Sequence, residues 1–524
     1  MTDHGPRFTR PDAVRFYWIM LFAAAPLYLP HGYIRALEDK TLFIWLAVAA
    51  TGSLFICLFI SDRLAVLFPA RHRGRALPRA RRAPVRFWSD SLLSIRLSAV
   101  PLDWAVALFG GTVLLSCLLS SWRKASFTGE KCWNVGGLLL LSMCALYFLC
   151  SSSLRRERLP FILFAGSGFF MMLLGFLNDL SMDPLGASKG MDSLWAASYT
   201  STIGNVNTYS GCLSILLPIL AAAFVSLPAS RQVPAAVALF LCYLNLFLTH
   251  ADSLYFSTAA TLSVLTVWCM RSKRRINGWS INLCLLGLAG SMAMIIVRIN
   301  PDLYLDELSP VLFRLWIPPI LLLTGIAGIL CCRLLPSRIG EAAEKRVRHI
   351  LFLGSFALLI LSFLAGILYA ATHFSRDFLN RRGLIWEIAV RAFLEGGIRE
   401  KLLGLGPGNL DEFALAYRHL IVRHYDGIYL LENAHNDLLE YLATTGLFGF
   451  LTYAGMYAWI LFDFIRRIRN RERCSRCQLY AFAGLFGYMT QSVFNGPHPL
   501  TTAFFFGLLS LYRGELPPLK VRTA

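Results

Sequence analysis

The amino-acid sequence predicts an all-α polytopic membrane protein, and two observations support that prediction. Of the 524 residues, 56% are hydrophobic and only 15% are charged, whereas a soluble protein carries about 25% charged residues. The apolar residues also fall in runs of about 18–22 residues, the length that an α-helix needs to cross roughly 30 Å of hydrocarbon. The mean hydropathy of +0.56 agrees with both observations.

We place about fourteen membrane helices on these apolar runs. The first run has no small-residue cleavage site after it, so we expect it to be retained as a helix. The helices are expected at residues 14–30, 42–61, 101–120, 135–151, 159–177, 207–227, 234–249, 254–270, 279–297, 309–330, 349–371, 436–463, 476–492 and 500–512.

The positive charge of the chain follows this membrane topology. The net charge is +19, and the cations gather in short loops at residues 62–88, 154–158, 271–275, 333–348 and 465–473. With fourteen helices these loops share one side with both termini, and the positive-inside rule makes that side the cytoplasm. Topology therefore explains the charge better than nucleic-acid binding does. The thirteen cysteines lie mostly inside apolar runs, and Cys474-x-x-Cys477 lacks the second pair that a zinc site needs.

The arrangement predicts four regions along the chain. Residues 1–100 hold N-terminal membrane helices and an arginine-rich cytoplasmic loop, and residues 101–371 hold the core helices. Residues 372–435 form a long external loop between helices 11 and 12, and residues 436–524 hold the C-terminal helices.

The long external loop has a structure of its own in the sequence pattern. Residues 383–396 have helical apolar spacing, which predicts an amphipathic helix along the membrane face. A glycine-rich turn at residues 404–408 follows, and then a second helical segment at residues 409–417. The apolar positions of the amphipathic helix are Leu384, Ile385, Ile388, Ala389 and Phe393.

His435 is the strongest candidate for catalysis. It lies in a polar cluster with Glu432, Asn433, Asn436 and Asp437, at the start of an apolar helix. A neutral imidazole can take a proton from an attacking hydroxyl group, and a flanking carboxylate can orient the ring. The alternative interpretation is a histidine at a helix N-terminus, with Asn433 as the cap residue.

Arginines and asparagines on the same predicted side complete the candidate site. The planar guanidinium group of arginine binds phosphate oxygens in pairs, which favours Arg381, Arg382 and Arg391 as ligands of a diphosphate. Attraction to anionic lipid headgroups is the alternative. Asn205 and Asn207 either bind sugar hydroxyls or cap the helix that follows them. The sequence contains no P-loop, no dinucleotide fingerprint, no HExxH and no external D-x-D pair, so we expect no cofactor and no metal ion.

Four segments lie in this order along the chain: the one with Asn205 and Asn207, the one that begins at Arg382, the glycine turn at residues 404–408, and the one that begins at His435. Together they resemble the O-antigen ligase and O-antigen polymerase family of bacterial envelope glycan enzymes. The resemblance runs from about residue 120 to about residue 465. One departure is clear: many family members have a Ser-Arg pair where residues 249–254 read Thr-His-Ala-Asp-Ser-Leu. Either another cation, Arg381 or Arg123, replaces that arginine, or this chain uses a different donor. The matching segments are Gly204-Asn205-x-Asn207, Arg382-Gly-Leu-Ile-Trp386, Gly404-x-Gly406-Pro-Gly408, and His435-Asn436-x-x-Leu439 followed by Gly446 and Gly449.

The resemblance implies a C-type glycosyltransferase (GT-C-like) membrane fold and a donor glycan carried on undecaprenyl diphosphate. It implies that His435 is the base and that Arg382 binds the diphosphate. Acceptor glycan or lipid and membrane lipids are the other expected partners, and the site is expected on the periplasmic side of a bacterial inner membrane. Further substrate contacts are expected from Arg381, Asn205, Asn207, Asn436, Asp437, Glu432, Trp386 and Arg391.

Two other functions remain open on the sequence. A polymerase that joins lipid-linked repeat units needs the same donor site and acceptor groove as a ligase. A transporter or lipid flippase also suits fourteen helices, although transporters place ionisable residues near the bilayer midplane. Here the polar residues gather at one predicted face instead.

Overall fold

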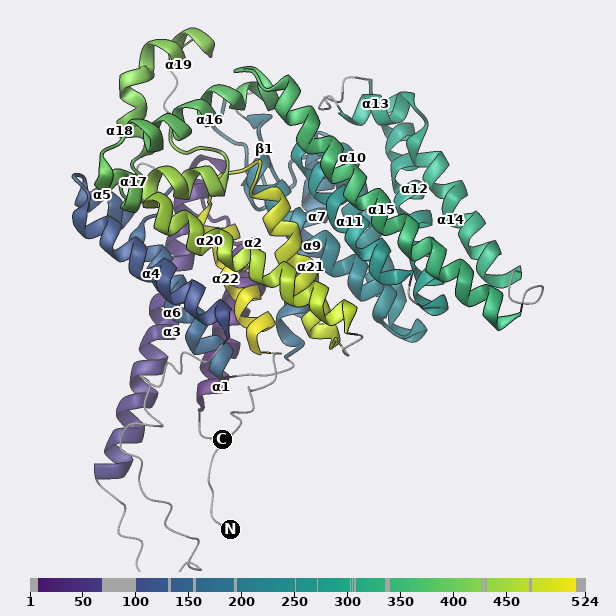
Figure 1. The fold of residues 1–524 in the computed structure, drawn as a ribbon, viewed down its shortest axis with the longest axis horizontal. Helices are drawn as coiled ribbons and strands as arrows, with labels where there is room; N and C mark the ends of the chain where they lie inside the picture. The colour runs from purple at the N-terminus through teal and green to yellow at the C-terminus, as the bar shows by residue number, and fades with distance from the viewer. Residues whose placement is uncertain are drawn as a thin grey trace, which may run out of the picture.

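The structure is a computed structural model, and it is almost entirely helical (Figure 1). A short antiparallel hairpin of β1 (Tyr199–Thr200) and β2 (Gly204–Asn205) interrupts the helices. The predicted arginine-rich loop lies largely outside the described residues. The structure describes residues 8–67, 100–130, 133–153, 157–192, 196–249, 251–270, 272–301, 303, 305, 308–334, 340–425, 427, 431–470 and 474–514.

The first half of the chain forms both short and long helices. They are α1 (Arg10–Trp18), the π-helical segment η1 (Ile19–Ala24), α2 (Ala25–Leu27), η2 (Tyr33–Arg35), α3 (Ala36–Leu67), α4 (Pro101–Leu119), α5 (Arg123–Thr128), α6 (Gly137–Ser153), α7 (Leu159–Asp179), α9 (Val206–Ser226), η3 (Ala229–Arg231), α10 (Gln232–Leu248) and α11 (Asp252–Cys269).

The second half adds a further group of long helices, a cluster of short ones and the C-terminal helices. They are α12 (Lys273–Ile299), α13 (Leu308–Arg314), α14 (Ile317–Leu334), α15 (Glu341–His373), α16 (Phe378–Glu395), α17 (Ile398–Leu403), α18 (Leu410–Ala414), η5 (Leu415–Tyr417), α19 (Arg418–His424), α20 (Asp437–Arg469), α21 (Arg476–Gln491) and α22 (Pro499–Gly514).

Each of the fourteen predicted ranges contains a helix, which confirms the all-α class. The predicted helix at residues 309–330 is divided, because the backbone of Trp316 is left-handed at φ 56° between α13 and α14. Within the described residues, eight helical segments are long and apolar enough to cross a membrane. That all fourteen helices cross the membrane stays a prediction. The eight are Tyr33–Leu64, Pro101–Leu119, Leu159–Asp179, Val206–Ser226, Ala229–Leu248, Lys273–Ile299, Ile317–Leu334 and Asp437–Arg469.

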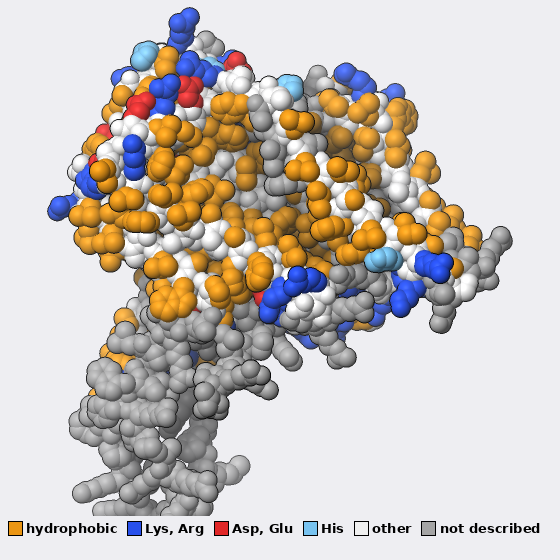
Figure 2. Space-filling model, in the orientation of Figure 1, with side chains coloured by type: hydrophobic (Ala, Val, Ile, Leu, Met, Phe, Trp, Pro, Cys, Tyr) orange, Lys and Arg blue, Asp and Glu red, His pale blue; other side chains and the backbone are white. Residues whose placement is uncertain are grey.

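Helix α9 is the centre of the packing. It contacts α7, α10, α11, α12, α21 and α22, and nearly all of its side chains are buried. Its closest approach is to α21, where a Cβ on Gly487 would lie 1.8 Å from the carbonyl oxygen of Ser214. The outer face seen in Figure 2 has hydrophobic side chains across its middle and charged side chains towards the two ends. That distribution is typical of a protein with a lipid-facing belt.

The predicted external segment lies over one end of the helices, at the top of Figure 1. The predicted amphipathic helix is present as α16, but other parts of the protein cover its apolar face. Its position along the membrane face stays a prediction. Leu384, Ile385 and Ile388 are at most 3% exposed, because they pack against side chains of α18, α19, α20 and the neighbouring loops. Burying this apolar face stabilises a small second core, so α16 holds α17 to α19 in place.

The glycine turn after α17 docks onto a kink in α20. Gly446 has φ 66° and ψ −167°, which interrupts the helix and frees carbonyl oxygens in the preceding turn. The N–H groups of Leu405 and Gly406 donate to the carbonyl oxygens of Ala443 and Thr444 at 3.1 and 2.8 Å. The turn thereby satisfies backbone groups that the kink leaves without helical partners.

Replacing Gly446 with Ala is expected to destabilise the protein by about 2 kcal/mol or more, because only glycine adopts this backbone conformation without strain. A Cβ there would also lie 2.4 Å from the backbone of Leu402. Gly455→Ala, in the same helix, is the matched control, since no atom lies within 4 Å of its Cβ position. Thermal inactivation in detergent measures both variants, and equal midpoints would contradict the role of the kink.

Candidate functional site

His435 lies in a short loop that polar side chains hold directly before α20. Its backbone is in the left-handed region at φ 47°. Asn433 Oδ1 accepts the N–H of His435 at 2.8 Å, and Glu440 Oε2 accepts the preceding backbone N–H at 2.8 Å. Asn436 caps α20, because its Oδ1 accepts a backbone N–H of the first turn at 3.1 Å. The cap residue is therefore Asn436 rather than Asn433, and none of these bonds uses the imidazole.

Arg382 reaches from α16 to the segment between α21 and α22. Its guanidinium group donates to the backbone carbonyl of Phe494, and a second nitrogen lies 3.5 Å from Asn207 Oδ1. Asn436 Nδ2 donates to the neighbouring carbonyl of Val493 at 3.0 Å. Because these two side chains bind adjacent carbonyls, α16 and α20 meet at the same short segment.

The imidazole of His435 and the guanidinium of Arg382 lie close enough to interact electrostatically. Burial of the ring, and secondly the positive charge of Arg382, lower the pKa of His435 to about 3. The ring nitrogen Nδ1 is enclosed and has no hydrogen-bond partner among the described residues. The imidazole is therefore neutral at physiological pH and has a lone pair with which to accept a proton.

Trp133 packs edge-on against the His435 ring, with 5.5 Å between the ring centroids. It precedes α6 and has a left-handed backbone at φ 45°. Its indole N–H donates to the carboxylate of Glu432. Burial raises the pKa of Glu432, which the Trp133 hydrogen bond partly offsets. Glu432 therefore orients Trp133, whereas we had expected it to orient the imidazole.

Asp437 is buried and is bound by tyrosines. Its Oδ2 accepts the hydroxyl groups of Tyr488 at 2.6 Å and Tyr453 at 3.1 Å. Neither Asp437 nor Glu432 hydrogen-bonds Nδ1 of His435. The prediction that a flanking carboxylate orients the imidazole is wrong, because Asp437 accepts hydrogen bonds from Tyr488 and Tyr453 and Glu432 accepts one from Trp133.

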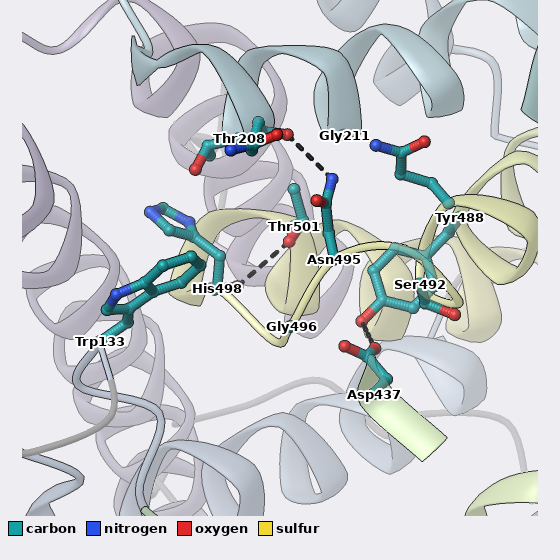
Figure 3. Close-up of a pocket in the computed structure, with 12 residues that line it drawn as sticks. Trp133, Thr208, Gly211, Asp437, Tyr488, Ser492, Asn495, Gly496, His498 and Thr501 are labelled. Atoms are coloured by element: carbon teal, nitrogen blue, oxygen red, sulfur yellow. Dashed lines mark hydrogen bonds between the residues drawn. The ribbon is translucent and has the colours of Figure 1, made fainter. Parts of the chain in front are cut away.

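A small cavity lies between α9, α20, α21 and α22 (Figure 3). Its volume is about 20 Å³, enough for about one water molecule or one hydroxyl group. Most of the residues that line it have polar side chains. The lining residues are Trp133, Asn207, Thr208, Gly211, Asp437, Tyr488, Gln491, Ser492, Asn495, Gly496, His498 and Thr501.

The two asparagines before α9 have different roles. Asn205 caps the helix, since its side chain accepts the N–H of Asn207 at 2.9 Å. Capping, the alternative to sugar binding, therefore accounts for Asn205. Asn207 lines the cavity, and its backbone carbonyl accepts Nδ2 of Asn495 at 3.1 Å. Asn207 also lies near Arg382, so it links the cavity to the guanidinium.

Three predicted site residues are directed elsewhere. Arg381 has φ 64° and donates to the carbonyl oxygen of His424 at 3.2 Å, so it connects α16 to the end of α19. Arg391 forms ion pairs of 3.0 and 3.2 Å with two glutamates of α16. Trp386 and Arg391 line a separate groove of about 550 Å³ between α16 and the start of α20. Their predicted substrate contacts stay predictions, outside the cavity.

His498 is a site residue that our sequence reasoning missed. It is 7% exposed, and its ring centroid lies 6.2 Å from that of Trp133. Burial, and secondly the charge of the buried Lys40, lower its pKa to about 3. The sequence feature that could have identified it is the segment Asn-Gly-Pro-His-Pro at residues 495–499. This segment is a polar break between two apolar runs, and His435 lies in a similar polar segment before an apolar run.

Among the described residues, no three His, Cys, Asp or Glu side chains gather closely enough to hold a metal ion. In the stretch 249–254, the Asp252 carboxylate accepts the N–H of Leu308 at 3.1 Å. His250 lies outside the described residues. The cation that lies near the His435 ring is Arg382.

The fold and the apolar helices define an all-α membrane-embedded protein with a polar cluster at one end of its helices. No protein-family profile matches the chain, and no curated protein matches it either. The function must therefore be argued from the geometry of the cluster.

Proposed function

We propose that this protein is a metal-independent membrane glycosyltransferase of C-type fold with fourteen membrane helices. It moves a glycan from an undecaprenyl-diphosphate-type lipid to a hydroxyl group of an acceptor, on the periplasmic side of a bacterial inner membrane. The proposal rests on one observation: a neutral, enclosed imidazole lies beside a guanidinium group at one end of the helices. An imidazole can act as the general base and a guanidinium can stabilise the leaving diphosphate in such a transfer.

In the proposed reaction, the imidazole of His435 takes the proton of the acceptor hydroxyl. The hydroxyl oxygen forms a bond to C1 of the donor sugar, and the bond between C1 and the phosphate oxygen breaks. The electron pair leaves with the lipid diphosphate, whose charge is balanced by Arg382. A preorganised donor aimed at developing charge contributes about 3–4 kcal/mol, which corresponds to about 10²–10³ in rate.

Donor binding has a second effect in this mechanism. A base with a pKa of about 3 is weak, and general-base catalysis is most effective when the pKa is near the working pH. The diphosphate brings negative charge next to Arg382 and reduces the repulsion that the imidazolium ion experiences. The donor therefore raises the pKa of His435 and makes it a stronger base.

This coupling predicts a difference between two pH profiles. In the free protein His435 stays neutral down to about pH 3, so its protonation should not lower kcat/KM between pH 7 and pH 5. In the donor complex the pKa is higher, so kcat should fall at a higher pH than kcat/KM does. Initial rates over pH 4–9 measure both. Glu432→Gln identifies any contribution from that carboxylate. A fall of kcat/KM centred near pH 6.5 in both the wild-type protein and Glu432→Gln would contradict a buried neutral imidazole.

The direct test of function uses purified protein with an undecaprenyl-diphosphate oligosaccharide and an acceptor glycan. We expect release of undecaprenyl diphosphate with and without a chelator. Inhibition by the chelator would overturn the metal-independent mechanism. Uptake of intact donor into vesicles without a covalent product would overturn the enzyme proposal in favour of a transporter.

Ligase and polymerase activities are separated in a deletion strain. Loss of a ligase leaves intact polymer on the lipid, whereas loss of a polymerase leaves single repeat units. The chain length of the lipid-linked glycan therefore distinguishes the two activities.

A further inference from the structure

His498 is held as a hydrogen-bond donor at the cavity. Its Nδ1 accepts the N–H of Leu500 at 3.2 Å, which places the proton of the neutral imidazole on Nε2. The flanking prolines Pro497 and Pro499 restrict the backbone on both sides. The side chain lines the cavity next to Trp133, as Figure 3 shows.

Asn495 presents the complementary acceptor. Its Nδ2 donates to the carbonyl oxygen of Asn207 at 3.1 Å, and this bond fixes the orientation of the amide. Its Oδ1 is enclosed and has no hydrogen-bond partner among the described residues. A buried acceptor without a partner is costly, so this site favours a ligand that brings a donor.

The donor and the acceptor match one chemical group. His498 Nε2 offers a donor and Asn495 Oδ1 offers an acceptor, and a hydroxyl group can both accept and donate a hydrogen bond. The cavity of about 20 Å³ has room for such a group but not for a sugar ring. Trp133 lies at the edge of the cavity and contacts the rings of both His435 and His498.

We propose that His498 and Asn495 form a subsite for one hydroxyl group of the transferred sugar, with Trp133 against the apolar face of that sugar. This inference rests on the proposed function and adds to it the part of the site that recognises the sugar. Since Trp133 contacts both histidines, the subsite places the sugar beside His435 and Arg382. His498 is a positioning residue and takes no proton in the reaction.

Two substitutions of His498 separate its two hydrogen bonds. His498→Asn keeps an oxygen acceptor for the Leu500 N–H but removes the donor in the cavity. His498→Gln places an amide N–H near the position of Nε2. We expect His498→Asn to weaken donor binding about 3–10-fold, as the loss of one hydrogen bond predicts, and His498→Gln to restore most of it. His419→Asn, an exposed histidine of α19, is the control.

Binding is measured without turnover, in protein that also carries His435→Asn, which removes the base and tolerates the left-handed backbone. The probes are undecaprenyl-diphosphate-linked hexose, N-acetylhexosamine and 6-deoxyhexose, each with analogues lacking a single hydroxyl. In protein that keeps His498, one deoxy analogue should bind about 3–10-fold more weakly than its parent sugar does. In protein with His498→Asn, that analogue should bind no more weakly than it does when His498 is present.

Each outcome decides the inference. If His498→Asn weakens all analogues equally, or lowers only the thermal stability, the cavity holds an ordered water and the subsite is overturned. If no probe binds, the subsite and the proposed function are both overturned. If binding follows the expected pattern but the protein with His435 shows no transfer, the subsite stands and the transferase proposal fails.

Discussion

Replacing His435 with alanine is expected to lower the rate of glycan transfer by about 10²–10⁴-fold, the usual contribution of a general base. The affinity for the lipid-linked donor should change much less, because the imidazole acts on the acceptor hydroxyl. The assay is release of undecaprenyl diphosphate at saturating donor.

The backbone of His435 requires a second variant. Alanine is disfavoured at φ 47°, whereas asparagine tolerates the left-handed region. His435→Asn therefore keeps the loop and removes the base, and it should be as inactive as His435→Ala. His419→Ala on α19 is the control, since that side chain is exposed at the same end of the molecule. Wild-type rates in both His435 variants would eliminate the proposed base.

Replacing Arg382 with alanine is expected to lower transfer by about 10²–10³-fold and to weaken donor binding as well. The guanidinium balances charge that grows on the leaving diphosphate, so the rate is more sensitive than the binding. Arg382→Lys keeps the charge but loses the paired geometry, and it should recover only part of the activity.

The same substitution has an effect that is independent of turnover. Because the positive charge of Arg382 lowers the pKa of His435, Arg382→Ala should raise that pKa from its value of about 3. NMR titration of labelled histidine measures the change. Arg35→Ala, an exposed arginine of η2, should alter neither the pKa nor the rate. An unchanged pKa in Arg382→Ala would show that the two groups do not share a site.

Local sequence patterns were sufficient for several structural elements. The apolar run and the glycines of residues 404–408 predicted α16 and the turn, because helical periodicity and positive φ depend on residues near in sequence. The three glycines at positions 404, 406 and 408 all have positive φ. Capping by Asn205 followed from the same local chemistry.

Other features required the tertiary structure. The sequence pattern of α16 predicts an apolar face that lies along the membrane, yet this face is covered by α18, α19, α20 and the neighbouring loops. Asp437 looks like a partner for His435, but the structure turns it towards Tyr488 and Tyr453. His498 lies 63 positions from His435 in sequence, and only the contact of each with Trp133 brings the two together.

The sequence by itself determined that this chain forms apolar helices and that a histidine, amides and arginines interrupt them at particular positions. It did so because hydrophobic length and helix periodicity are properties of short stretches. Only the tertiary structure decided which of those polar groups meet. Contacts between α9, α16, α20 and the α21–α22 segment depend on how helices far apart in the chain pack and on the kink at Gly446, and neither is encoded within a single stretch.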